Sequence, residues 1–101
     1  MMHTWAICAY KDSQYLESCI KSLFSQSVKS NIILCTSTPS EYIYMLAEKY
    51  DIPVYLRDGI SSIASDWNFA YDTAETELVT IAHQDDMYEH DYLKTVLDMK
   101  K

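Results

Sequence analysis

Two adjacent carboxylates, Asp85 and Asp86, follow a short apolar run at residues 78–82 in the segment "LVTIAHQDD". The run has the length and composition of a buried strand, so both acids should lie where that strand leaves the core. Neighbouring side chains at a strand end point in different directions, so one acid can face a ligand while the other accepts hydrogen bonds. Adjacent acids at a cleft suit a hard divalent cation such as Mg²⁺ or Mn²⁺, which prefers oxygen ligands and often shares a phosphate. The alternative is that they only stabilise the start of the next helix, by about 1 kcal/mol or less.

The elements that must position these acids alternate along the chain. Apolar runs typical of buried strands occur at residues 4–10, 31–36, 54–57 and 78–82. Segments with apolar residues at helical spacing follow them, through residues 15–24, 43–50, 63–71 and 92–97. This alternation predicts right-handed crossovers and a three-layer α/β/α sandwich with a mainly parallel four-stranded sheet. Ligands of such sheets collect at the carboxyl ends of the strands, where Asp85 and Asp86 fall.

Two local predictions concern the helices. Thr38, Pro39 and Glu41 in "TPSE" form a capping box pattern, with Thr38 as the cap and Pro39 at the first helical position. Trp67 lies on the apolar stripe of the third helix, together with Ala70. We therefore expect Trp67 to be a core residue rather than an exposed platform for a ligand.

Composition restricts the class of protein. The chain of 101 residues is 49% apolar with one glycine and two prolines, which predicts one globular domain over residues 1–101. Its formal charge of −7 argues against nucleic acid or an anionic membrane as a partner. No apolar run approaches the ~20 residues of a membrane span. Cys8, Cys19 and Cys35 each fall in an apolar pattern without zinc spacing, so we expect buried thiols and a cytoplasmic location.

Three segments in order resemble the amino-terminal half of family 2 glycosyltransferases, which have the GT-A fold. They are "AICAYKDSQYLESCIKSLFSQS", "NIILCTST" and "GISSIASDWNFAYDTAETELVTIAHQDDMY". Here "CAYK" stands where the family has a Pro-Thr-Tyr-Asn-like tetrapeptide, and "YLESCIKSL" resembles the helix that follows it. Asn68 and "HQDD" match the later order of a helical Asn, a strand and a D-x-D-D-type acidic motif.

The resemblance implies a nucleotide-diphosphate sugar held over the strand ends, with a divalent metal, Mn²⁺ or Mg²⁺, between the diphosphate and the acidic motif. Asp85 matches the metal-binding acid, and Asp86 would be its neighbour at the donor or acceptor side. His83 occupies the place of the first acid of the motif. A neutral imidazole can hydrogen-bond or bind a metal but brings no negative charge, so we expect weaker or altered metal use.

The remaining donor contacts are assigned by the same resemblance. Ala9 and Tyr10 match positions that line the base and the ribose. Thr36 stands where the family commonly has an acid that reads the base; its hydroxyl can accept a hydrogen bond but supplies no carboxylate, so the base preference stays open. Asp66 and Asn68 lie on one side of the third helix and could hydrogen-bond donor hydroxyls.

The implied reaction is an inverting transfer of a sugar to an unknown saccharide or lipid-linked acceptor, in polysaccharide biosynthesis. That displacement needs a carboxylate base, which the family carries in a later segment together with the acceptor site. We therefore expect residues 1–101 to hold the donor without completing the transfer alone. The rival interpretation of the same residues is a non-catalytic α/β interaction module whose acids only cap the last helix.

Overall fold

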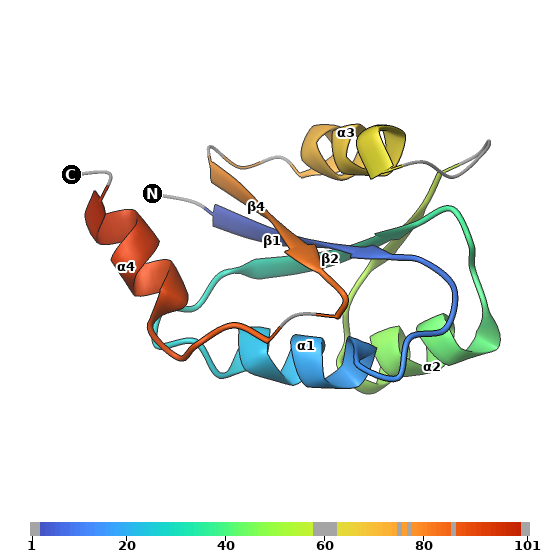
Figure 1. The fold of residues 1–101 in the computed structure, drawn as a ribbon, viewed down its shortest axis with the longest axis horizontal. Coiled ribbons are helices and arrows are strands. Elements are labelled where there is room, and N and C mark those ends of the chain that lie inside the picture. Colours follow the sequence, from blue (N-terminus) through green and yellow to red (C-terminus); the bar gives the residue numbers. More distant parts are fainter. Residues whose placement is uncertain (1–2, 58–62, 75, 77, 86, 100–101) are drawn as a thin grey trace.

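Strands and helices alternate strictly in the computed structural model, which describes residues 3–57, 63–74, 76, 78–85 and 87–99 (Figure 1). For residues 63–66, 71, 96 and 99 the description covers the backbone alone. The elements are β1 (His3–Ala9), α1 (Leu16–Phe24), β2 (Asn31–Thr36), α2 (Glu41–Lys49), β3 (Val54–Leu56), α3 (Ile63–Thr73), β4 (Leu78–His83) and α4 (Tyr92–Met99). Each lies where the hydrophobic period predicted it.

The sheet is parallel throughout its four strands, in the order β3-β2-β1-β4. Helices α1 and α2 cover one face and α3 covers the other, which confirms the predicted α/β/α sandwich (Figure 1). The chain moves from β1 through β2 to β3, and then returns to the far side of β1 as β4. The carboxyl ends of β1 and β4 therefore form the topological switch point, where ligands of open α/β sheets usually bind.

The core is divided by the sheet because successive strand residues point to opposite faces. The larger cluster lies between the sheet and α1, α2 and α4; its fully buried members include Trp5, Ile7, Leu16, Ile20, Leu34, Ile43 and Leu93. The smaller cluster lies under α3 and contains Ala6, Ile33, Cys35 and Ala70. Among the described residues, the α3 face of the sheet thus carries the smaller part of the core.

The start of α2 differs from the capping box that the sequence predicted. Ser40 is the N-cap: its hydroxyl accepts a hydrogen bond from the Ile43 amide at 3.2 Å and donates one to Asp12 at 2.6 Å. Thr38 was the wrong choice of cap, because its hydroxyl accepts instead from the amide of Lys11 at 2.6 Å. The bond between Ser40 and Asp12 and the bond between Lys11 and Thr38 both join the loop after β2 to the loop after β1.

The three cysteines carry thiols rather than disulfides, as predicted. Cys19 and Cys35 are buried, and Cys8 is half-buried. Burial raises the pKa of the Cys35 thiol to about 12, with a smaller contribution from Cys8, so this thiol stays protonated near neutral pH.

Among the described helices, none combines the length and the apolar character needed to span a membrane.

Candidate functional site

A hollow opens at the switch point between β1 and β4. It has a volume of about 400 Å³. The loop after β1 and the loop after β4 line it, through Tyr10, Asp12, Ser13, Gln14, Tyr15, Gln84 and Asp85. Of the site residues predicted from the sequence, Tyr10 and Asp85 thus come together in one concavity.

The carboxylate of Asp85 is held on one side. Its Oδ1 accepts a hydrogen bond from the Ser13 hydroxyl at 2.6 Å, and the Ser13 oxygen in turn accepts from the amide of Tyr15 at 3.2 Å. The side chain of Asp85 is otherwise exposed, and within the described part of the chain it has no second hydrogen bond. One carboxylate oxygen is therefore oriented, while the other is open to solvent or to a cation.

Gln84 joins the same two loops beside Asp85. Its side-chain Oε1 accepts from the Tyr10 amide at 3.0 Å, and its Nε2 donates to the Tyr10 carbonyl at 2.9 Å. Lys11, which follows Tyr10 in the chain, has a positive φ of 54° and places its ammonium 5.2 Å from the centre of the Tyr10 ring. These contacts fix the backbone that borders the hollow.

Ser13 and Gln84 are functional candidates that the sequence reasoning missed. The available signal was the occurrence of short polar segments, "YKDS" and "HQDD", at the carboxyl ends of two strands. Their individual contacts span 72 and 74 positions in the chain. Side chains that join such distant loops cannot be recognised from local spacing.

His83 lies on the other side of this edge, outside the hollow of Asp85. Its ring meets the ring of Trp67 edge to face, with the centroids 5.2 Å apart. Trp67 is 41% exposed, so the expectation of a core tryptophan was wrong. The reason is position: Ala70 of α3 is fully buried on the sheet, whereas Trp67 lies one turn earlier, against the last residue of β4, where the sheet ends. Asn68, the next residue, is exposed as well.

Two further residues that were predicted to contact the donor, Ala9 and Thr36, are buried. Ala9 is 4% exposed and packs in the larger core cluster, and it is not among the described residues that line the hollow at Asp85. Thr36 is 3% exposed, and its hydroxyl accepts from the amide of Thr38 at 3.0 Å. The hydroxyl of Ser37 is buried without a hydrogen-bond partner among the described residues. Asp86 and the side chain of Asp66 lie outside the described residues.

The donor set fits a shared cation rather than an all-protein metal site. Among the described residues, no group of three or more His, Cys, Asp or Glu side chains is placed to hold a metal ion. Mg²⁺ and its relatives are, however, commonly held by one or two carboxylates together with substrate phosphates and water. Asp85 meets that requirement, because its carboxylate is oriented, exposed and in a concavity.

Comparison with known proteins agrees with this architecture. The sequence model of "Glycosyl transferase family 2" matches residues 4–100, nearly the whole chain. No significant match is found among curated proteins.

Solved structures show the same fold at low sequence identity. The crystal structure of S. aureus TarS superposes with a TM-score of 0.83 at 20% identity, over 97% of this chain and 19% of that one. The crystal structure of S. aureus TarS 1-349 gives a TM-score of 0.84 at 20% identity, over 97% of this chain and 32% of that one. The chain thus spans less than a third of either. It belongs to glycosyl transferase family 2 and folds as the matching part of a GT-A domain.

Proposed function

We propose that this chain binds the nucleotide-diphosphate sugar of a family 2 glycosyltransferase at the carboxyl edge of its sheet, together with Mn²⁺ or Mg²⁺ at Asp85. The observation that carries the proposal is the exposed Asp85 carboxylate, oriented by Ser13 inside a concavity at the switch point. A carboxylate that served only to stabilise the start of α4 would not require a partner from the loop after β1.

The charge of the site supports the proposal of a cation. Asp12 and Asp85 both line the hollow, and the chain carries a formal charge of −7. A diphosphate brought to this edge would be repelled by both carboxylates at close range. Asp85 would hold a divalent cation, which would offset that repulsion and would supply Lewis-acid stabilisation of the negative charge on the departing nucleotide.

The rest of the donor is proposed to lie along the same edge. Tyr10 offers an exposed ring for the base or ribose, and Thr36 at the end of β2 stays in the proposal as a contact to the base. On the α3 side, Asn68 can bond sugar hydroxyls beside the His83 and Trp67 rings. Asp66 and Asp86 stay in the proposal as further donor contacts, whereas Ala9 could contribute only through its backbone.

The reaction that we propose for the whole enzyme is an inverting transfer to a saccharide or lipid-linked acceptor in polysaccharide biosynthesis. The base that deprotonates the acceptor is proposed to lie outside residues 1–101. We place the reaction in the cytoplasm, in keeping with three cysteines that carry thiols. The role of the residues described here is to bind and orient the donor.

Calorimetric titration with a panel of nucleotide-diphosphate sugars, with and without Mn²⁺, tests the proposal. Asp85→Asn keeps an acceptor for Ser13 but removes the charge; Glu48→Gln removes an equivalent exposed charge on α2 and serves as the matched control. We expect Mn²⁺-dependent binding in the native chain and in Glu48→Gln, weakened about 10-fold or more in Asp85→Asn. Metal-independent binding, or equal binding by both variants, would contradict the assignment.

A further inference from the structure

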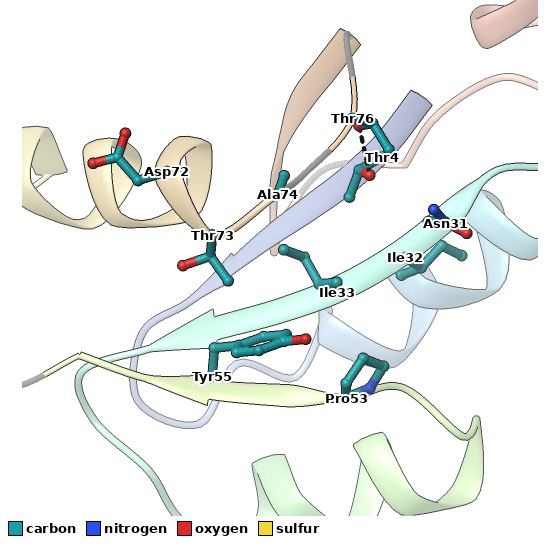
Figure 2. A pocket seen from close by; sticks show the side chains of 10 residues that line it. All are labelled: Thr4, Asn31, Ile32, Ile33, Pro53, Tyr55, Asp72, Thr73, Ala74 and Thr76. Atoms are coloured by element: carbon teal, nitrogen blue, oxygen red, sulfur yellow. Dashed lines mark hydrogen bonds between the residues drawn. The ribbon is translucent and has the colours of Figure 1, made fainter. Parts of the chain in front are cut away.

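A second concavity lies at the opposite, amino-terminal end of the strands. It forms on the α3 face of the sheet, between the end of α3 and the edge strand β3, and has a volume of about 610 Å³ (Figure 2). Helix α3 packs mainly against β1, β2 and β4. Among the described residues, the groove opens on the β3 side of that face. The described residues that line it differ from those that line the hollow at Asp85.

The floor of this groove combines an aromatic ring with aliphatic side chains. Ile33 lies in the middle, with Ala74 above it and the ring of Tyr55 beside it (Figure 2). The side chain of Tyr55 is 41% exposed, and its hydroxyl points toward the end of the sheet where Pro53 lies. One face of a flat, partly apolar ligand ring could therefore be buried against Tyr55.

Hydroxyl groups form the rim on the β1 side. The Thr76 hydroxyl donates to the Leu78 carbonyl at 2.8 Å, so in the 2.8 Å pair with Thr4 it acts as the acceptor and Thr4 as the donor. The Thr73 hydroxyl is likewise used as a donor, to the Phe69 carbonyl at 2.7 Å. Thr73, which is half-buried, thus keeps oxygen lone pairs that can accept a hydrogen bond from a ligand, whereas Thr4 is buried and its hydroxyl is used within the protein.

Donors are supplied by two other side chains. The Asn31 amide and the Tyr55 hydroxyl have no hydrogen-bond partner among the described residues, and both line the groove. Asp72 also borders it, but its carboxylate points away from Tyr55 and Ile33 (Figure 2). The groove therefore offers acceptors and donors around an apolar floor, which matches a ligand whose hydroxyls do both.

The charge of the groove selects against anions. No Lys, Arg or His is among its described lining residues, and the chain as a whole carries a formal charge of −7. Phosphates, nucleic acids and acidic lipids are therefore disfavoured. The volume falls within the range of about 300–1,000 Å³ that is usual for small-molecule sites. We propose that this groove binds a neutral saccharide, with one sugar ring packed on Tyr55 and its hydroxyls bonded to Asn31 and Thr73.

This site would not hold the reacting end of an acceptor. A strand of six residues separates the two ends of the sheet by about 20 Å at ~3.3 Å per residue. A saccharide in the groove would instead anchor a remote part of a glycan to this domain. The inference goes beyond donor binding and does not depend on it.

The test is a ¹H–¹⁵N NMR titration of the chain with maltopentaose, cellopentaose and chitopentaose, each at millimolar concentration. We expect at least one to shift the amides of Thr4, Ile33, Tyr55 and Thr76. Tyr55→Ala should weaken binding about 10-fold or more, as removal of a central aromatic anchor does, whereas Tyr55→Phe should retain most of the affinity. Tyr44→Ala, which removes a comparably exposed tyrosine (45%) from α2, should leave the affinity unchanged.

Asn31→Ala provides a second variant should Tyr55→Ala disturb the edge strand; it should weaken binding severalfold. Absence of shifts with all three sugars, shifts confined to residues 10–15 and 84–85, or unchanged affinity in Tyr55→Ala and Asn31→Ala would overturn the proposal. A parallel titration with uridine-diphosphate glucose and Mn²⁺ should shift residues 10–15 and 84–85 instead. The two sites can therefore fail independently.

Discussion

The Ser13 hydroxyl donates a 2.6 Å hydrogen bond to the Asp85 carboxylate across 72 positions of sequence. The bond joins the loop after β1 to the loop after β4, at the point where the strand order reverses. It fixes one oxygen of the carboxylate that we assign to the cation. Partners that orient a metal ligand are commonly worth 10–100-fold in affinity, so Ser13 should matter although it touches no metal itself.

Ser13→Ala should weaken Mn²⁺-dependent donor binding about 10-fold, because the Asp85 carboxylate loses its orienting partner. The bond lies at the surface, so the free energy of unfolding should fall by only about 1 kcal/mol. Calorimetry and urea denaturation measure the two effects. Ser25→Ala, which removes an exposed hydroxyl bonded to the Lys21 carbonyl at 2.9 Å, is the control. Native affinity in Ser13→Ala would show that the bond has no part in binding.

Gln84→Glu should destabilise the fold by about 1–2 kcal/mol, since it removes the donor to the Tyr10 carbonyl and sets a carboxylate against that oxygen. Gln14→Glu introduces the same charge into the same hollow from an exposed residue. It should change the unfolding free energy by no more than about 0.5 kcal/mol. Urea denaturation followed by circular dichroism compares the two. Similar losses in both variants would mean that added charge, and not the bond to Tyr10, is responsible.

Ser40→Ala should cost about 1 kcal/mol of unfolding free energy, the usual effect of removing an N-cap. The variant loses the hydrogen bond from the Ile43 amide and the one to Asp12. Ser27→Ala, at an exposed position between α1 and β2, should change stability little. Thermal unfolding of the two variants checks this. If Ser40→Ala melted at the native temperature, Ser40 would not be the residue whose cap stabilises α2.

His3 should make the fold sensitive to acid. The ring is 6% exposed and is hydrogen-bonded to the hydroxyls of Ser30 at 2.7 Å and Thr80 at 2.8 Å. Burial lowers the pKa of His3 below its ordinary value of 6.5. Below about pH 6.5 His3 therefore binds a proton in the unfolded chain but not yet in the folded chain. The contribution of His3 to the free energy of unfolding is complete above that pH and is lost as the pH falls toward the pKa of His3 in the folded chain.

Urea denaturation at pH 7.5 and pH 5.5 tests this linkage, because the two conditions lie about one pH unit on either side of the ordinary histidine pKa of ~6.5. The native chain should lose more stability between these two conditions than His3→Gln, whose side chain does not titrate. His90→Gln, which changes an exposed histidine, should behave like the native chain. The same pH dependence in all three proteins would locate the acid sensitivity in other groups.

The fold could be predicted from the sequence because its signals are local. The run at residues 31–36 became β2 with those same bounds, and the helical stripe through Ile43 and Leu46 became α2. The position of Asp85 followed from the rule that parallel strands present their carboxyl ends to ligands. Asp85 was therefore placed correctly at the carboxyl edge of the sheet, where it lines the hollow, and donor binding at this edge stays a prediction.

The details that failed depend on contacts between distant segments. Thr38 and Ser40 are both good caps by residue type, and the amide of Lys11 decides between them by engaging Thr38. Trp67 has the spacing of a core residue, but its side chain lies at the end of the sheet against His83. Ser13 and Gln84 act across loops that meet only after folding. Sequence periodicity carries no information on contacts between distant loops.

The most direct test of the account is paramagnetic broadening of NMR signals by Mn²⁺ in the presence of a nucleotide diphosphate. If Asp85 holds the cation, substoichiometric Mn²⁺ should broaden the amides of residues 10–15 and 84–85 first, and Asp85→Asn should abolish that pattern while Glu48→Gln preserves it. Broadening that is absent from this edge, or that persists unchanged in Asp85→Asn, would contradict the assignment of Asp85 and with it the proposed mode of donor binding.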